Sequence, residues 1–243
     1  MIAAIIAANV IMQTNPACIP AINEGPTKAG DYDWMARHQA VLDWNKTHKS
    51  DLVFIGDSIT HGFGGDPQAY PKWRGNAPDI WDKYFGPRNP VNLGFGWDQT
   101  QHVLFGAFST ENWTVYRRKQ LSSSLGQTTQ VTTLRSRCTA GLWRLWKRAE
   151  PSARSAEILI LSIFPRDAEV TENRKKNDRV NEALAKYQWG EKTRFIDMNP
   201  YFLLPGSQKR KEECFSDYCH LTKAGHQVWA DAIEPTLKEI WSK

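Results

Sequence analysis

The chain has 243 residues, of which 41% are hydrophobic and 23% charged, the ordinary composition of a globular domain. This length is sufficient for one domain with a sizeable core. No apolar run reaches the roughly 18 residues that a membrane-spanning helix needs, so we expect no membrane span. The formal net charge of +5 would fit a protein that binds nucleic acid.

The excess of positive charge comes from one stretch of the chain. Residues 105–148 hold eight Lys or Arg residues and one acidic residue, a net charge of +7, so the rest of the chain carries −2. A nucleic-acid-binding protein would need this stretch to fold into a positive patch, with Trp113, Trp143 and Trp146 as its aromatic residues. Nucleic-acid binding is therefore an alternative hypothesis, and our prediction is that the protein has no nucleic-acid partner.

The N-terminal segment, residues 1–28, begins with an apolar run and has no Lys or Arg before Lys28. A secretory signal has a basic region, an apolar core and a small-residue cleavage site. Here the core is short and the basic region is missing. We expect either a truncated signal peptide or a start assigned upstream of Met12, and we favour export over a cytoplasmic location.

Before residue 105, apolar patterns alternate between the spacings of helices and strands. They predict a helix within 31–51, a buried parallel strand at 52–56, a short helix at 76–86 closed by Gly86, a strand at 90–96 and a helix from Asp98. After residue 148 they predict a strand at 156–164, a helix at 172–187, a strand at 193–198 and a helix at 221–241.

Strands that alternate with helices indicate a parallel sheet covered on both faces. We therefore predict a single doubly wound, three-layer α/β/α domain over residues 29–243. One central strand–helix unit is missing from the pattern, and residues 105–148 lie in its place.

Ser58 directly follows a predicted strand, in the Gly-flanked turn of FIGDSITHGFGG (54–65). Ligands of open parallel sheets bind outside the carboxyl ends of the strands, so a serine there is well placed as a nucleophile. The alternative is that Asp57 or Ser58 only caps the next helix.

Asp217 and His220 lie three residues apart, in a loop just before the last predicted helix. A serine hydroxyl needs a base, and the base needs an acidic partner that fixes its tautomer. Either residue alone is as well explained by a helix cap or a surface histidine. Together with Ser58, they indicate nucleophilic catalysis.

A third turn, NLGFGWDQTQ (92–101), follows the second predicted strand. Its stretch Gly94–Trp97 can direct backbone N–H groups at an oxyanion, together with the N–H of Ser58. Turn chemistry alone also accounts for its glycines.

These stretches resemble the SGNH (GDSL) hydrolases, in particular the branch similar to platelet-activating-factor acetylhydrolases. The matching stretches are VFIGDSITHGFGG, VNLGFGWDQTQHVL, ILILSIFPRD and DYCHLTKAGHQVWADAI. The resemblance implies a flavodoxin-like fold with Ser58 as nucleophile, His220 as base and Asp217 as its partner. It also implies an oxyanion hole that includes the backbone of Ser58, Gly96 and Trp97.

By the same resemblance, the chain is a serine esterase that removes a small acyl group, such as acetyl, from a lipid or carbohydrate ester, with no cofactor. The family's side-chain oxyanion donor is an Asn in a GTNN-type turn after the central strand. This sequence has no such turn, and Asn112 is the only asparagine within 105–148. A non-catalytic pseudoenzyme or ligand-binding α/β domain is therefore the alternative.

The four cysteines are Cys18, Cys138, Cys214 and Cys219. With His220 and His226, the last two suggest a zinc site, but their C-x4-C-H pattern lacks the usual paired-ligand spacing. We predict no metal, and either free thiols or one disulfide.

Residues 105–148 have no hydrophobic periodicity, and a shifted reading frame explains them. Codons read one step out of frame permit the family's continuation in the right order and spacing, through an apolar strand to GTNN. Some products are forced: Trp113–Thr114 must give Asp, and Gln127–Thr128 must give Asn or Asp. We predict that this segment is translated out of frame, with a polar insertion or a basic loop as alternatives. We also expect it not to form the central strand, because KQLSSSL replaces large apolar side chains worth roughly 1.5–3 kcal/mol each.

Restoring the frame from codon 105 to about codon 148 should recover cooperative unfolding and the implied esterase activity together, since it returns both the strand and the oxyanion Asn. Thermal unfolding and acetyl-ester hydrolysis of the two chains measure this. A chain that, as written, melts sharply and is equally active would show that 105–148 is a genuine structural element.

Overall fold

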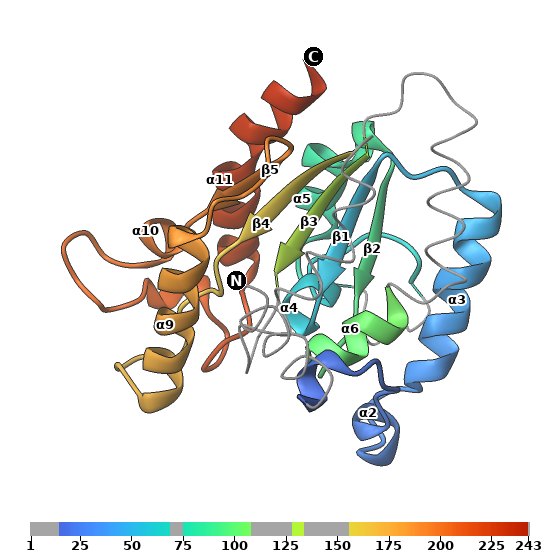
Figure 1. Cartoon of the computed structure of the whole chain (residues 1–243), viewed down its shortest axis with the longest axis horizontal. Helices are drawn as coiled ribbons and strands as arrows, with labels where there is room; N and C mark the ends of the chain where they lie inside the picture. The colour runs from blue at the N-terminus through green and yellow to red at the C-terminus, as the bar shows by residue number, and fades with distance from the viewer. Residues whose placement is uncertain (1–14, 69–74, 108–127, 134–155, 243) are drawn as a thin grey trace, which may run out of the picture.

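The computed structural model describes residues 15–68, 75–107, 128–133 and 156–242. A parallel five-stranded sheet lies between two layers of helices (Figure 1). None of the helices in the described residues combines the length and the hydrophobicity of a membrane span. The three-layer α/β/α architecture expected from the sequence is confirmed.

The sheet has the strand order β2-β1-β3-β4-β5, with every neighbouring pair parallel. Its strands are β1 (Leu52–Gly56), β2 (Pro90–Gly94), β3 (Thr128–Thr133), β4 (Ala156–Leu161) and β5 (Thr193–Ile196). The chain passes from β1 outward to β2 and then back across β1 to β3. In such a sheet the ligand crevice lies where the strand order reverses, outside the carboxyl ends of β1 and β3.

The expectation that residues 105–148 would not supply the central strand is wrong. β3 pairs along its length with β1, from Leu52↔Thr129 to Gly56↔Thr133, and with β4 on its other side. Five of its six residues, TTQVTT, are β-branched, a composition that favours strands even though it is not strongly apolar. The two flanking ladders also satisfy its backbone polar groups. The stretch KQLSSSL lies outside the described residues, and the frameshift itself stays a prediction.

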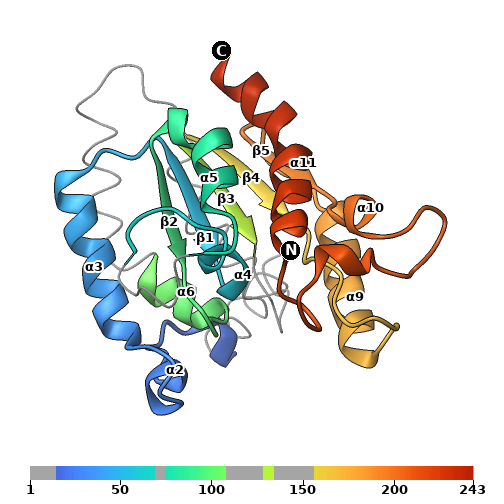
Figure 2. The same cartoon turned by 180° about the vertical axis from the view of Figure 1, so that it is seen from behind.

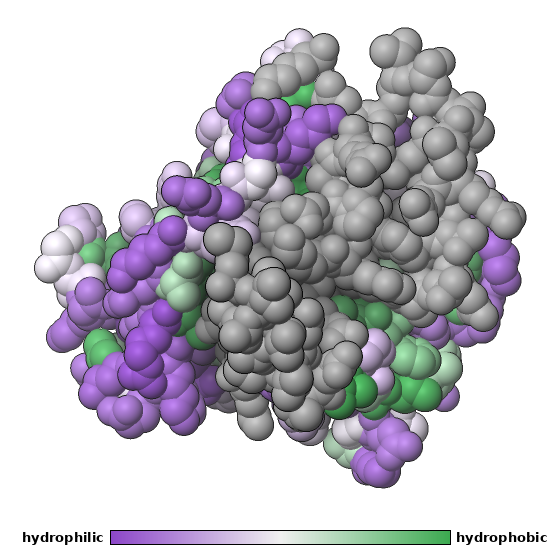
Figure 3. Space-filling model, viewed as in Figure 1, coloured by the Kyte–Doolittle hydropathy of each residue, from purple (hydrophilic) through white to green (hydrophobic). Residues whose placement is uncertain are grey.

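Helices cover both faces of the sheet (Figures 1 and 2). One layer contains α3 (Trp34–Thr47), α6 (Thr100–Gly106) and α9 (Glu172–Lys186), and the other contains α5 (Pro78–Tyr84) and α11 (Lys223–Trp241). Shorter helical turns are η1 (Pro16–Cys18), α2 (Gly25–Lys28), α4 (Ser58–His61), η3 (Gly86–Arg88), α10 (Asn199–Phe202) and η5 (Glu212–Cys214). The solvent side of α9 is hydrophilic (Figure 3), as the polar composition of this helix requires.

β1 is buried on both faces and holds the two halves of the core together. Because successive side chains point to opposite faces, Leu52 and Phe54 face α5 and α11, while Val53 and Ile55 face α3 and α6. The Phe54 ring lies 4.6 Å from Trp81 and 4.7 Å from Phe85, measured between ring centroids. Aromatic packing of this kind fixes the carboxyl end of β1, from which Ser58 projects.

The described part of the N-terminal segment packs against the domain. Thr100 Oγ1 donates to the Ala17 carbonyl at 2.8 Å, and the Ala21 N–H donates to the Gln101 carbonyl at 3.1 Å. These contacts show that the described part of the N-terminal segment packs against the first turn of α6. Residues 1–14, which include most of the predicted signal-like run, lie outside the described residues.

Candidate active site

Ser58 is the first residue of α4, directly beyond the carboxyl end of β1. Asp57 caps this turn, since its Oδ1 accepts the Ile59 N–H at 2.9 Å. Asp57 is therefore the residue that caps the turn, and the Ser58 side chain is not used for capping. Only 7% of Ser58 is exposed, so its hydroxyl lies in a largely water-excluded position.

The loop between η5 and α11 holds Asp217 and His220. An antiparallel bridge from Phe215 to Leu221 closes the loop, and Asp217 Oδ1 accepts the backbone N–H groups of Cys219 and His220, both at 2.7 Å. Thr222 caps α11 immediately afterwards. The backbone of its own loop thus holds the Asp217 carboxylate in place, independently of its contacts with other side chains.

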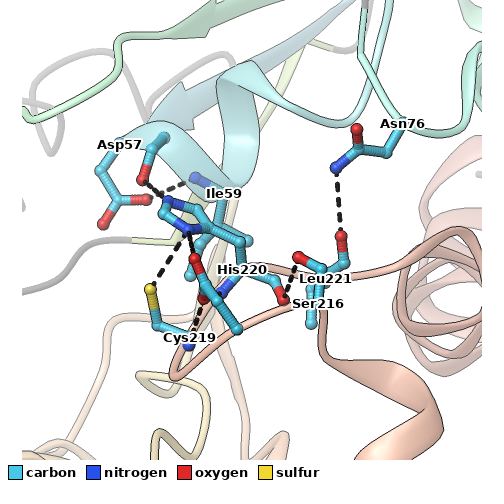
Figure 4. Close-up of polar contacts among 9 residues, drawn as sticks. Asp57, Ile59, Asn76, Ser216, Cys219, His220 and Leu221 are labelled. Atoms are coloured by element: carbon cyan, nitrogen blue, oxygen red, sulfur yellow. Dashed lines mark hydrogen bonds and ion pairs between the residues drawn. The ribbon is translucent and has the colours of Figure 1, made fainter.

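The two segments meet at the His220 ring (Figure 4). Its Nδ1 lies 2.6 Å from Asp217 Oδ2, and its Nε2 lies 2.9 Å from Ser58 Oγ, across 162 positions of sequence. An ionised carboxylate can only accept a hydrogen bond, so Nδ1 carries the proton and donates to Asp217, which leaves Nε2 as the acceptor for the Ser58 hydroxyl. The structure brings all three sequence-derived candidates into one hydrogen-bonded chain.

Asp217 is strongly biased toward its ionised form. Partial burial alone raises the pKa of this carboxyl, but the hydrogen bonds from the His220 side chain and from the backbone of His220 and Cys219 outweigh it. The net result is a pKa well below the usual range. An ionised carboxylate here holds the imidazole tautomer and would stabilise an imidazolium.

Asn76 ties the two sides of the site together and was not found from the sequence. Its Nδ2 donates to the Leu221 carbonyl at 3.1 Å, next to His220 (Figure 4). Its backbone N–H donates to the Gly62 carbonyl, just beyond α4. A single asparagine outside any motif gives no sequence signal for such a role.

The structure of the 94–98 turn contradicts the expectation that the Gly96 N–H belongs to the oxyanion hole. The Gly96 N–H donates to Nδ1 of the buried His61 at 3.1 Å, so it is not directed at a substrate. Trp97 has a left-handed backbone (φ 68°), which is costly for a bulky side chain and is found mostly at functional sites. Among the described residues its N–H meets no acceptor. Trp97 and Ser58 thus remain as the candidate backbone donors.

A buried polar network beneath this turn was also missed. Arg37, on α3, is 2% exposed and donates to the carbonyls of Gly94, Asn92 and Pro67. Burial lowers the pKa of its guanidinium to about 10. For His61, burial and then the nearby Arg37 charge lower the pKa well below the usual range. The ring is therefore neutral, and its Nδ1 accepts the Gly96 N–H.

Tyr32 and Asp98 complete this support. The Tyr32 hydroxyl donates to the Gly96 carbonyl at 2.8 Å, and Asp98 Oδ1 accepts from Trp34 Nε1 at 2.7 Å and Asn23 Nδ2 at 3.0 Å. Burial raises the pKa of Asp98 well above its usual value. Neither role is visible in the sequence, because the partners of both side chains lie 64 or 75 positions away along the chain.

The structure describes three of the four cysteines and one group of possible metal ligands. Of the described cysteines, Cys18, Cys214 and Cys219 are buried and none is in a disulfide; Cys138 lies outside the described residues. Cys214 and His226 do not join Cys219 in a ligand group. Asp217, Cys219 and His220 do place their ligand atoms within 4.8 Å of one another.

Residues 54–228 match the model of the GDSL-like lipase/acylhydrolase family. The chain belongs to this family. The match includes the Ser58 turn, the 94–98 turn and the loop with Asp217 and His220, so the resemblance noted from these motifs is confirmed. Family membership makes the chain a hydrolase of carboxylic esters.

Curated relatives and solved structures agree with this assignment. The chain is 27% identical over 212 residues to the platelet-activating factor acetylhydrolase IB subunit alpha1 of Pongo abelii, covering 87% of this chain and 85% of the relative. A putative acylhydrolase from Bacteroides fragilis superimposes with a TM-score of 0.64 at 17% identity, over 86% of this chain and 99% of that one. A mutant of an acetyl-xylooligosaccharide esterase from Geobacillus stearmophilus gives a TM-score of 0.51 at 17% identity, over 78% of this chain and 93% of that one. The two structures show a shared fold.

Gly94→Ala should disrupt the site through the backbone. A Cβ at this position would lie 2.3 Å from the His61 nitrogen and 2.7 Å from the Thr60 carbonyl carbon, so β2 and α4 would have to separate. We expect a loss of about 1–3 kcal/mol in the free energy of unfolding, as for other overpacked positions, and loss of esterase activity. Denaturant unfolding and ester hydrolysis measure the two effects.

Gly190→Ala is the matched control, because a Cβ there meets nothing within 4 Å. Equal denaturation midpoints for the two variants would show that β2 and α4 do not need this close approach.

Proposed function

We propose that the chain is a serine esterase that removes a small acyl group, most simply acetyl, from a lipid or carbohydrate ester. The observation that carries the proposal is the continuous chain of hydrogen bonds from Asp217 through His220 to Ser58. In this proposal Ser58 is the nucleophile, His220 the general base and acid, and Asp217 the residue that orients the base.

In the first step, Ser58 Oγ attacks the ester carbonyl while its proton passes to His220 Nε2. The imidazolium that forms lies 2.6 Å from the ionised Asp217, which stabilises its charge. The tetrahedral oxyanion is bound by the N–H groups of Ser58 and Trp97. His220 then protonates the leaving alkoxide, and the acyl group stays on Ser58.

In the second step, water enters and gives a proton to His220 Nε2 as it attacks the acyl-enzyme. Collapse of the second tetrahedral intermediate releases the carboxylic acid and returns the proton to Ser58 Oγ. Both steps use the same base and the same backbone donors. Neither requires a cofactor.

The substrate class is supported by the names of similar proteins. One relative is named as a subunit of a platelet-activating factor acetylhydrolase, and one structure of the same fold is named as an acetyl-xylooligosaccharide esterase. Both names contain an acetyl group and differ in the molecule that carries it. We therefore propose acetyl as the acyl group, and for the alcohol only that it belongs to a lipid or a carbohydrate.

The triad predicts non-additive losses. Ser58→Ala, His220→Ala and the double variant should each lower kcat/KM for p-nitrophenyl acetate by a similar factor, about a thousandfold or more, because the two residues act as a unit. Asp217→Asn should cost the same or less. The acetyl ester should react faster than the butyryl ester.

Ser242→Ala, at an exposed position in the last turn of the chain, is the control for a serine outside the site. Losses that add in the double variant, or unchanged activity in Ser58→Ala, would contradict the mechanism. A folded chain with no activity toward any acyl ester would support the pseudoenzyme alternative.

A further inference from the structure

The loop that carries the proposed base has three side chains of the types that bind zinc. Asp217, Cys219 and His220 each offer one ligand atom, and these atoms all lie within 4.8 Å of one another. No other group of three such residues occurs in the part of the chain that the structure describes. Figure 4 shows the Cys219 sulfur beside the His220 ring.

Of the two distances that join these ligand atoms to the His220 ring, one already suits a tetrahedral ion and the other is too short. Cys219 Sγ lies 3.5 Å from His220 Nδ1. Bond lengths of about 2.3 Å to sulfur and about 2.0–2.1 Å to nitrogen place two ligands of a tetrahedral zinc about 3.5 Å apart. Asp217 Oδ2 is closer, at 2.6 Å from Nδ1. It would have to withdraw by about 0.7 Å to admit an ion.

Access and ligand chemistry also fit. The side chains of His220 and Asp217 are 34% and 41% exposed, so an ion can approach from solvent and keep a water as its fourth ligand. Thiolate and imidazole ligands favour zinc over magnesium or calcium.

We propose that this loop binds Zn²⁺ or a similar soft divalent metal through Cys219 Sγ, His220 Nδ1 and Asp217 Oδ2, and that the bound ion inhibits the esterase. The inhibition, though not the binding, rests on the proposed function. The group acts as an inhibitory site because the ion occupies the ring nitrogen that faces away from Ser58.

Proton positions explain the inhibition. In the active tautomer Nδ1–H donates to Asp217, and Nε2 accepts the Ser58 proton. A metal at Nδ1 takes that lone pair, so the neutral ring carries its proton at Nε2 instead. Nε2–H then donates to Ser58 Oγ and can no longer act as a base. The Cys219 thiol proton passes to solvent, and no electron is transferred.

Cys214 offers a matched comparison. It lies on the same segment, five residues before Cys219, and is equally buried, but it is not part of the ligand group. Replacing either cysteine removes one buried thiol. Only the change at Cys219 removes a ligand.

The binding test uses the Ser58→Ala chain, so that its outcome does not depend on activity. Titration with Co²⁺ should give one thiolate-to-metal absorption band in the near ultraviolet, saturating at one ion per chain. Competition against a chromophoric chelator then gives the Zn²⁺ affinity. We expect Cys219→Ser to remove the band and to weaken zinc binding by at least about tenfold. Cys214→Ser should keep both.

The kinetic test compares each variant with its own metal-free rate. Zn²⁺ should inhibit the chain with Ser58 intact and its Cys214→Ser variant, a chelator should reverse the inhibition, and Cys219→Ser should resist it. Cys219→Ala is made in parallel, because a buried serine hydroxyl can itself destabilise the loop.

Absence of the cobalt band, or equal zinc affinity with and without Cys219, would overturn the proposal. Loss of affinity in Cys214→Ser alone would also overturn it, because it places the ion elsewhere. If zinc binds through Cys219 but the intact chain hydrolyses no ester, the metal site stands and the proposed function fails.

Discussion

The hydrogen bond between Ser58 Oγ and His220 Nε2 is the contact on which the whole site depends. It joins two segments that lie 162 positions apart, at 2.9 Å. A shift of 1 Å in either segment would remove it, so each must be fixed independently. On one side, the aromatic packing around Phe54 holds the end of β1. On the other, Asp217 fixes the loop through two backbone N–H groups before it orients the ring.

The 94–98 turn is fixed at a higher energetic cost. Arg37 and Asp98 are both buried, and buried ionisable groups are destabilising unless their polar atoms are satisfied. Arg37 satisfies three carbonyls of neighbouring segments, and the neutral His61 takes the Gly96 N–H. These contacts over-determine the turn, which lets Trp97 keep a left-handed backbone. Polar burial here stabilises one geometry of the turn rather than the domain as a whole.

Local patterns were sufficient to predict most of the fold. Apolar runs located β1, β2 and β4, and apolar residues at helical spacing located α3, α9 and α11. They were also sufficient for Ser58, Asp217 and His220, because each lies in a short turn whose chemistry is visible in a few neighbouring residues. The parallel topology then brought these turns to one edge of the sheet.

Long-range contacts account for what the sequence did not reveal. The 105–148 segment was not expected to supply the central strand, because it lacks hydrophobic periodicity and its KQLSSSL stretch is polar. The β-branched residues of 128–133 and two flanking ladders nevertheless place that stretch there as β3. Gly96 was assigned to the oxyanion hole from the family resemblance, and nothing local in the sequence shows that the buried His61 accepts its N–H. Arg37 and Asn76 act through carbonyls of distant segments, and such contacts leave no pattern in the sequence.

Covalent labelling of the nucleophile is the most direct test of the catalytic site. The native chain would be treated with a fluorophosphonate ester, and the modified residue located by mass spectrometry of its peptides. If His220 activates Ser58, one adduct per chain should form on Ser58, and it should form much more slowly in His220→Ala. An adduct on a different serine, or an unreactive Ser58 in a chain that remains folded, would contradict the Ser58–His220–Asp217 mechanism.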